Sequence, residues 1–437
     1  MSNYVTKKTD GNTKWFIKDR FGMFIHFGLY SMTGRHEWSK GFEQISDEQY
    51  DKYFKHFNAD MFDAKEWACK AKNAGMKYAV LTAKHHEGFC MFDSAYTDYK
   101  STNTPSERDF VKEFVEAFRE EGIRVGLYYS LIDWHHPDYQ IDIFHPRRNA
   151  PDAEEQNKTR DMNRYREYLF NQVREILTNY GKIDILWFDF TYPSLESIRN
   201  EYNAHFIKDY KEWMPWTTPK TWNSDALIKM IREIQPEIII NDRLGIMQDV
   251  KTPEQSTVLD WPLYPGTNEK AVWEACHTFS GAWGYSRDEM SWKTPDALIR
   301  TLINCVSKGG NLIMNVGPMA RGCFDSRADA ALKVYEEWMK FNSRSIYDCT
   351  MADEEFAAPQ GTLITQSNDG KKLYIHLIEY PFGEIVLENA AGKVDYAQFL
   401  HDSSEIRIRE EESGSVSILV PGIRPKCEVP VIEIFLK

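Results

Sequence analysis

Asp189 is the residue whose position most clearly suggests chemistry. It follows Ile183–Phe188, a mostly apolar run whose length suits a strand buried on both faces. In folds built on parallel strands, reactive side chains stand at the carboxyl ends of the strands. Asp189 is therefore a candidate nucleophile or general acid/base. The simpler alternative is that it only caps a following helix.

Cleavage of a glycosidic bond is one reaction that such a carboxylate serves, provided that a second carboxylate flanks the same bond. Three glutamates on or after predicted strand ends could supply the second group, namely Glu37, Glu254 and Glu274. Any one of them alone would more often be an ordinary surface residue. Their spacing along the chain does not choose among them.

Three histidines also follow predicted strands, His26 after the first and His85 and His86 after the second. Metal sites on barrels usually take an alternating His-x-His pair, or a His-x-x-x-His pair on a helix. His85 and His86 are adjacent, so on a strand they would point to opposite faces and could not readily share an ion. We therefore expect no metal and no cofactor. Binding of sugar hydroxyls is the favoured role, with a plain core histidine as the alternative for one of them.

The elements that must position these residues alternate between strand and helix over about 340 residues. The predicted strands are 21–28, 77–85, 124–131, 183–190, 237–243, 273–277 and 311–317, and the main predicted helices are 63–74, 107–121, one ending near Tyr180, 224–234, 295–308 and 326–341. Nearly every strand ends in a polar residue, whereas a doubly wound sheet concentrates its site at one switch point. The pattern favours a (β/α)8-type barrel, with an eighth strand hidden in the irregular region after Arg243.

The pattern changes after about residue 345, where short and partly alternating runs replace the long helices. These runs are 362–366, 373–378, 384–387, 406–409, 415–420 and 431–436. Asn368-Asp-Gly370 is a hairpin-turn signal between the first two. We predict a barrel domain at residues 1–344 and a C-terminal antiparallel β-sandwich at residues 345–437.

The composition of the chain indicates which classes of partner the protein is not expected to bind. The net charge of −13 opposes nucleic-acid binding, which needs a basic patch, and no apolar stretch reaches the length of a membrane span. The first 14 residues lack the apolar core of a signal peptide, and the 7 cysteines contain no Cys-x-x-Cys pair. We expect a cytoplasmic protein with reduced thiols, unless an export signal has been removed. The oligomeric state stays open, a homo-oligomer included.

Seven short motifs in register carry a resemblance to a known family. They are His26-Phe-Gly-Leu-Tyr30, His36-Glu-Trp38, Lys84-His-His-Glu-Gly-Phe89, Leu186-Trp-Phe-Asp189, Asn241-Asp-Arg243, Trp273-Glu-Ala-Cys276 and Trp283-Gly-Tyr285. Over about residues 10 to 345 the chain resembles the α-L-fucosidases of glycoside hydrolase family 29. That family carries a sandwich where this chain has its predicted β-domain.

The resemblance implies a retaining, exo-acting hydrolase of terminal α-L-fucosyl linkages, with a fucosylated oligosaccharide or glycoconjugate as substrate. Asp189 would be the nucleophile that forms a covalent fucosyl-enzyme. Glu254 is the favoured acid/base, and Glu274 is its rival. The residues implied to bind the fucose hydroxyls or to position the nucleophile are His26, Glu37, Trp38, His85, His86, Tyr128 and Arg243. Trp187 and Trp283 would wall the sugar pocket.

Two other functions compete with this one. The first is a metal-dependent barrel hydrolase, which a chelator would inactivate. The second is a catalytically inactive fucose-binding relative, and the presence of Asp189 with candidate acids argues against it.

The connection 191–223 is longer than we expect for the family and rich in aromatic residues. We hypothesise that it walls the leaving-group side of the pocket.

Overall fold

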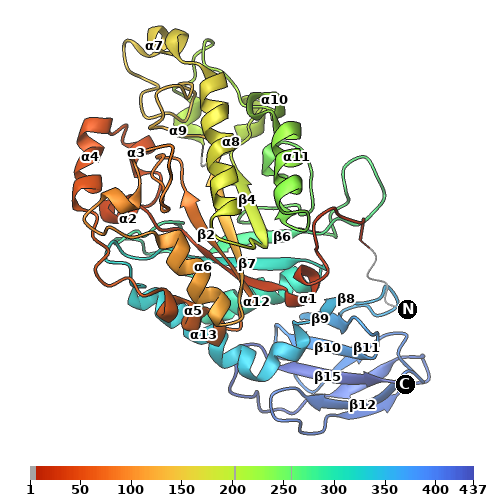
Figure 1. Cartoon of the computed structure of the whole chain (residues 1–437). Helices are drawn as coiled ribbons and strands as arrows, with labels where there is room; N and C mark the ends of the chain where they lie inside the picture. Colours follow the sequence, from red (N-terminus) through yellow and green to blue (C-terminus); the bar gives the residue numbers. More distant parts are fainter. Residues whose placement is uncertain (1–5, 201–202, 257) are drawn as a thin grey trace.

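The computed structural model describes residues 6–200, 203–256 and 258–437. Its larger part is a parallel sheet curled into a barrel, with helices outside it (Figure 1). Within the described residues this sheet has seven strands in the order β5-β4-β3-β2-β1-β7-β6. Their bounds are β1 Phe21–Ile25, β2 Tyr78–Lys84, β3 Arg124–Ser130, β4 Ile185–Asp189, β5 Ile239–Ile240, β6 Glu274–Thr278 and β7 Asn311–Val316. The barrel-type fold is confirmed.

The gap between β5 and β6 is filled by the segment where an eighth strand was expected. Isolated parallel bridges join Asn241 to Val250 on one side and Lys251 to Trp273 on the other. A further bridge pairs Glu254 with Cys276 of β6. Residues 250–254 thus close the barrel without forming a regular strand, and they bring Glu254 to the rim.

The predicted helices are present in the predicted order, whereas α4 and the short helices were not predicted. The longer ones are α4 Asp47–His56, α5 Ala64–Asn73, α6 Phe110–Glu120, α8 Met162–Thr178, α11 Ser224–Ile234, α12 Pro295–Val306 and α13 Ser326–Asn342. The short ones are α1 Phe16–Asp19, α2 Tyr30–Thr33, α3 Ser39–Phe42, α7 Ala153–Thr159, α9 Ala204–Ile207 and α10 Pro219–Trp222. Two helices begin with favoured capping residues: the Asp63 side chain accepts from the backbone of α5, and the Thr294 side chain accepts from the backbone of α12, which starts at Pro295.

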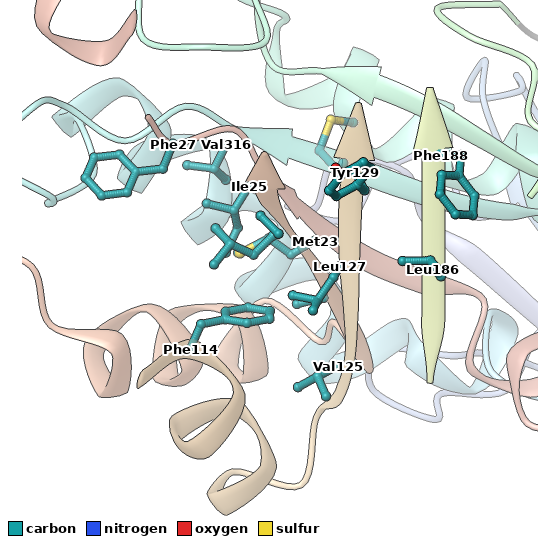
Figure 2. Packing of buried hydrophobic residues seen from close by; sticks show 14 of the residues in the cluster. Met23, Ile25, Phe27, Phe114, Val125, Leu127, Tyr129, Leu186, Phe188 and Val316 are labelled. Carbon is teal, nitrogen blue, oxygen red and sulfur yellow. The ribbon is translucent and has the colours of Figure 1, made fainter. Parts of the chain in front are cut away.

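The main core lies between the sheet and the helices. Figure 2 shows Met23, Leu127 and Leu186 pointing out of the strands, with Phe114 of α6 among them. Alternate residues of the same strands point inward, and these include Phe24, Trp187 and Ile313. This alternation follows from the pleat of each strand, and it stacks the inward side chains in layers up to the carboxyl rim.

The C-terminal part is an antiparallel β-sandwich, as predicted. Its described strands form a five-stranded sheet, β12-β15-β10-β9-β8, and a three-stranded sheet, β11-β14-β13. The bounds are β8 Cys349–Met351, β9 Thr362–Ser367, β10 Lys372–Leu377, β11 Glu384–Leu387, β12 Val394–Phe399, β13 Arg407–Glu410, β14 Val416–Leu419 and β15 Val431–Leu436. Two of these strands were not predicted, since β8 is only 3 residues long and a register shift between Val394 and Tyr396 interrupts the alternation of β12.

The proposed domain boundary at residue 344 stays a prediction; α13 ends at Asn342 and β8 begins at Cys349. Among the residues that the structure describes, no helix combines the length and apolarity needed to cross a bilayer.

Candidate active site

A cavity of about 730 Å³ opens at the carboxyl rim of the barrel. Its lining combines carboxylates, histidines and aromatic rings that come from most of the barrel strands and from the connection 191–223. The lining residues are Phe24, His26, Trp38, His85, His86, Tyr128, Trp187, Asp189, Phe190, Thr191, Tyr192, Ser197, Asn200, Asn203, Arg243, Glu254, Gln255, Cys276, Ser280, Gly281 and Trp283. Most of the residues predicted from the sequence therefore meet in one place.

Asp189 is the last residue of β4, and its carboxylate is held from two sides. The Tyr128 hydroxyl donates to Oδ2 at 2.9 Å, and Nη1 of Arg243 donates to Oδ1 at 3.2 Å. The strand beneath it is fixed by Asn241, whose side chain exchanges hydrogen bonds of 2.9 and 2.8 Å with the backbone of Phe188. This amide continues the ladder where β5 has already ended, so the nucleophile candidate stands on a rigid support.

Phe190 follows Asp189 with a φ of 84°, in the left-handed region that residues with a side chain rarely adopt. Its ring packs against Trp38 and His86, with centroid distances of 5.2 and 4.6 Å. Such backbone strain, of order 1–3 kcal/mol, persists only where the surroundings enforce it. The turn keeps Phe190 and the next two residues in the lining of the cavity immediately after the carboxylate.

The surroundings of Asp189 shift the pKa of its carboxyl group in opposite directions. Burial raises the pKa of Asp189 to about 6, and the nearby Glu254 acts in the same direction. The Arg243 guanidinium and the Tyr128 hydrogen bond lower it, because both stabilise the ionised form. A pKa near 6 leaves most of this carboxyl ionised at neutral pH, as a nucleophile requires.

Glu254 stands on the segment that closes the barrel, and its side chain is 40% exposed to the cavity and solvent. Nη2 of Arg243 donates to its Oε2 at 2.9 Å. Arg243 thus joins Asp189 and Glu254, while its Nε and Nη2 bond to Thr252 at 3.1 Å each. One fixed guanidinium therefore brings two carboxylates to the same cavity.

Glu274 was expected at the end of its strand, but it is the first residue of β6. It is only 2% exposed, and within the described residues it is not part of the cavity lining. The hydroxyl of Tyr78, the first residue of β2, donates to its Oε2. The placement at the rim was wrong, because Glu274 begins β6 and pairs with Asn311, the first residue of β7, so it lies at the opposite, amino end of the barrel.

Glu37 is also buried, at 2% exposure, and lies outside the described lining of the cavity. Its Oε2 accepts from the backbone N–H groups of Trp283 and Gly284, at 3.1 and 2.7 Å. The carboxylate therefore holds the loop that carries Trp283. In this structure it supports the wall of the cavity from behind.

The three histidines all line the cavity. The expectation that His85 and His86 point to opposite faces was wrong, because β2 ends at Lys84 and both residues lie beyond the pleat. Nδ1 of His26 lies 2.6 Å from Asn315 Oδ1, and Nδ1 of His86 lies 2.7 Å from Ser130 Oγ.

Burial holds the pKa of His26 and of His86 well below the usual value, so both rings are neutral at pH 7. A neutral imidazole can donate from one nitrogen and accept at the other, which suits an uncharged, hydroxyl-bearing ligand.

Aromatic rings form the apolar side of the cavity. Trp187 lies 5.7 Å from the Tyr128 ring in a stacked arrangement, and the Arg243 guanidinium lies 5.2 Å from the Trp187 ring. Phe24 lies 5.2 Å from Trp187 and 6.0 Å from Trp283. An apolar wall opposite hydrogen-bonding groups fits a ligand with one polar and one apolar face.

Several lining or supporting residues were not predicted. Phe24 and Asn315 belong to β1 and β7, and the rule that points to polar residues at strand ends would have found Asn315. Tyr192, Ser197, Asn200 and Asn203 belong to the connection 191–223, of which residues 201 and 202, Tyr202 included, lie outside the described part. No periodic pattern marks these residues. Over the residues described, no group of three or more His, Cys, Asp and Glu side chains is placed to hold a metal ion.

Comparisons with known proteins agree on one family. A family model described as alpha-L-fucosidase matches residues 2–344. The structure of α-L-fucosidase isoenzyme 1 from Paenibacillus thiaminolyticus is 41% identical in sequence, with a TM-score of 0.87 over 97% of this chain and 98% of that chain. The curated α-L-fucosidase of Dictyostelium discoideum is 28% identical, over 96% of this chain and 91% of that protein.

A further solved structure carries mechanistic information. It is a family GH29 α-L-fucosidase from Bacteroides thetaiotaomicron, 27% identical, with a TM-score of 0.79 over 100% of this chain and 99% of that chain. It is described as a trapped covalent intermediate in complex with 2-fluoro-fucosyl fluoride, obtained with a variant in which a glutamate is replaced by glutamine.

Proposed function

Because the chain belongs to the α-L-fucosidases of glycoside hydrolase family 29, we propose that it removes terminal α-L-fucosyl residues from glycans through a covalent fucosyl-enzyme. The observation that carries this proposal is the pair of carboxylates, Asp189 and Glu254, joined by Arg243 at one cavity. The covalent intermediate trapped in the Bacteroides relative supports the same route.

Terminal action is supported by the shape of the cavity. Its inner end is closed by side chains of the barrel interior, since Phe24 is 1% and Trp187 is 3% exposed. A single sugar at a chain end can enter such a site, whereas an internal residue would need a cleft open at both sides. The apolar wall suits the methyl group of a 6-deoxy sugar, and His26, His85 and His86 suit its hydroxyls.

The reaction is assigned to two displacements. In the first, Asp189 Oδ attacks the anomeric carbon while Glu254 gives a proton to the departing oxygen, which leaves as an alcohol. In the second, Glu254 takes a proton from water, the water oxygen bonds to the same carbon, and the bond to Asp189 breaks. Arg243 balances the charge of the two carboxylates between these steps, and each displacement inverts the carbon, so the configuration is retained overall.

The proposed activity is tested with 4-nitrophenyl α-L-fucoside, with the first-formed sugar followed by proton NMR. We expect turnover and α-L-fucose as the first product. Absence of turnover in folded protein would favour the inactive fucose-binding relative. Loss of turnover on treatment with a chelator would favour the metal-dependent hydrolase. The cytoplasmic location and the oligomeric state stay predictions.

The acid limb of the pH profile should report Asp189. With a pKa of about 6, kcat/KM falls as the pH drops through 6, because the nucleophile becomes protonated. Tyr128→Phe removes the hydrogen bond that stabilises the carboxylate, so the pKa rises and the acid limb moves to higher pH. The pH dependence of kcat/KM should be measured for the wild type and for Tyr128→Phe. An unmoved or lowered limb in Tyr128→Phe contradicts this assignment.

The connection 191–223 should control the leaving group. Ser197 and Asn200 are neutral, exposed residues that line the cavity, and besides their bonds to the backbone of Ser194 and Asn203 their side chains have further hydrogen-bonding capacity for a ligand. We expect Ser197→Ala with Asn200→Ala to lower kcat/KM for a fucosylated oligosaccharide about 10-fold or more, the effect of about two lost hydrogen bonds. The 4-nitrophenyl fucoside should change far less. Equal losses on both substrates would count against a leaving-group role.

A further inference from the structure

Glu274 is a buried carboxyl that the proposed chemistry does not use. It lies in the barrel interior at the start of β6, two residues before Cys276, which lines the cavity. Apolar side chains form a cluster in this interior, and they include Phe16, Val80, Ile185, Ile239, Val272 and Ile313. An acidic group among such residues needs a physical reason.

The polar neighbours of Glu274 come from three other strands. The Tyr78 hydroxyl on β2 donates to Glu274 Oε2, and Asn311 Nδ2 on β7 lies 3.3 Å from the Tyr78 oxygen. Trp187 on β4 is the second side chain that stabilises the ionised form of Glu274, which lowers its pKa. The Trp187 indole nitrogen is itself buried and makes no hydrogen bond of standard geometry within the described chain. Glu274 therefore lies beneath the ring that walls the sugar cavity.

The surroundings favour a neutral Glu274. In the described part of the chain it has no ion-pair partner within 4.0 Å, and it is 2% exposed. The titratable groups that face it, Tyr78, Cys276 and Cys305 of α12, are uncharged at pH 7, because burial raises the pKa of each. Burial likewise raises the pKa of Glu274, to about 8. An ionised carboxylate without a cation in such an interior would be strongly destabilising.

We propose that Glu274 is a positioning residue, which is bonded to Tyr78, stays a neutral carboxylic acid at the working pH and supports the Trp187 indole from beneath, so that the ring keeps its place in the cavity wall. It holds a proton without transferring it to the substrate. Its influence on the reaction passes through Trp187, which stands two residues before Asp189 on the same face of β4.

The first test needs no activity. In the unfolded chain Glu274 has the ordinary glutamate pKa of about 4.3, so between about pH 4 and pH 8 the folded state binds one more proton than the unfolded state. Because the folded state binds the extra proton, the free energy of unfolding of the wild type falls as the pH rises through this range. Glu274→Gln is neutral at every pH and lacks that slope.

Tm should be measured for the wild type and for Glu274→Gln from pH 5 to pH 9. The Tm of Glu274→Gln minus the Tm of the wild type should increase by about 1–2 °C per pH unit up to about pH 8. Above that pH the difference becomes constant. Parallel curves throughout would overturn the proposal, because they would mean that Glu274 is ionised in the folded protein.

The second test rests on the proposed fucosidase activity. Glu274→Leu roughly keeps the volume, but it leaves the Tyr78 hydroxyl without its acceptor and removes the polar group near the buried Trp187 indole nitrogen. We expect KM for 4-nitrophenyl α-L-fucoside to rise about 10-fold while kcat changes less than threefold. Glu274→Gln should return KM to within threefold of the wild type.

Two outcomes would overturn the positioning role. One is an unchanged KM in folded Glu274→Leu. The other is formation of α-L-fucosyl azide by the Glu274 variants on addition of azide, which would identify Glu274 as the acid/base. If the protein shows no turnover at all, the fucosidase proposal fails, whereas the Tm comparison still decides whether Glu274 carries a proton.

Discussion

Asp189→Ala lowers kcat for aryl α-L-fucosides by about 10⁴-fold or more, because the group that forms the covalent intermediate is gone. Asp189→Asn gives a similar loss while keeping the shape of the side chain and its contacts with Tyr128. The fold survives, since Asp189 bonds to few groups beyond Tyr128 and Arg243. Steady-state rates and Tm values measure the two effects separately.

Azide gives this prediction a chemical signature. In Asp189→Ala the anion can occupy the space of the carboxylate and attack the anomeric carbon directly, so a single inversion produces β-L-fucosyl azide. Asp260, an exposed residue on the connection that also carries Glu254, offers a matched control in Asp260→Ala. Full activity in Asp189→Ala, or loss of activity in the control, would contradict the assignment.

Glu254→Ala should show the second largest effect. Loss of a general acid lowers the rate by about 10²–10⁴-fold for substrates with poor leaving groups, which need protonation as they depart. Substrates with a good leaving group, such as 2,4-dinitrophenyl fucoside, need little protonation, so formation of the fucosyl-enzyme stays fast. The comparison of kcat/KM between the two substrate types measures this dependence.

The same variant should accumulate the intermediate, because no base activates water in the second step. Added azide then attacks the fucosyl-enzyme and gives α-L-fucosyl azide, the anomer opposite to that from Asp189→Ala. Equal losses on all substrates and no azide product would mean that Glu254 only supports Arg243. In that case another proton donor at the cavity would have to be found.

Much of the fold was predictable because local signals agreed with one another. Asp63 and Thr294 are helix caps that the sequence reveals directly, and the polar residues after apolar runs marked the carboxyl rim. The same rule placed His26, His85 and Asp189 in one site, since parallel strands of a barrel end on the same side. The strand-end position of a side chain is thus readable without a structure.

The choice between Glu254 and Glu274 was harder, because it depends on where a strand begins. Glu274 is the first residue of β6 and pairs with the first residue of β7, so it lies at the amino end of the barrel and not at the expected rim. Glu254 has no local signal, since its segment closes the barrel through isolated bridges to Asn241, Trp273 and Cys276. Such long-range pairing has no periodic pattern in the chain.

Glu37 illustrates a second limit. Its motif predicts contact with the sugar, whereas the structure directs Oε2 to the backbone of Trp283 and Gly284. The direction of a buried side chain depends on the partner that the rest of the fold supplies, here a loop almost 250 residues away. The cavity walls from the connection 191–223 were foreseen as a region, and the residues within it were not.

The most direct measurement for the whole account uses 2-deoxy-2-fluoro-α-L-fucosyl fluoride. The fluorine at C2 slows both displacements, while the fluoride leaving group keeps the first fast enough to occur, so the fucosyl-enzyme accumulates. Mass spectrometry of the digested protein should find the added sugar on the peptide that contains Asp189, and nowhere else. A label on another side chain, or an unlabelled enzyme that releases β-L-fucose from α-fucosides, would contradict the account.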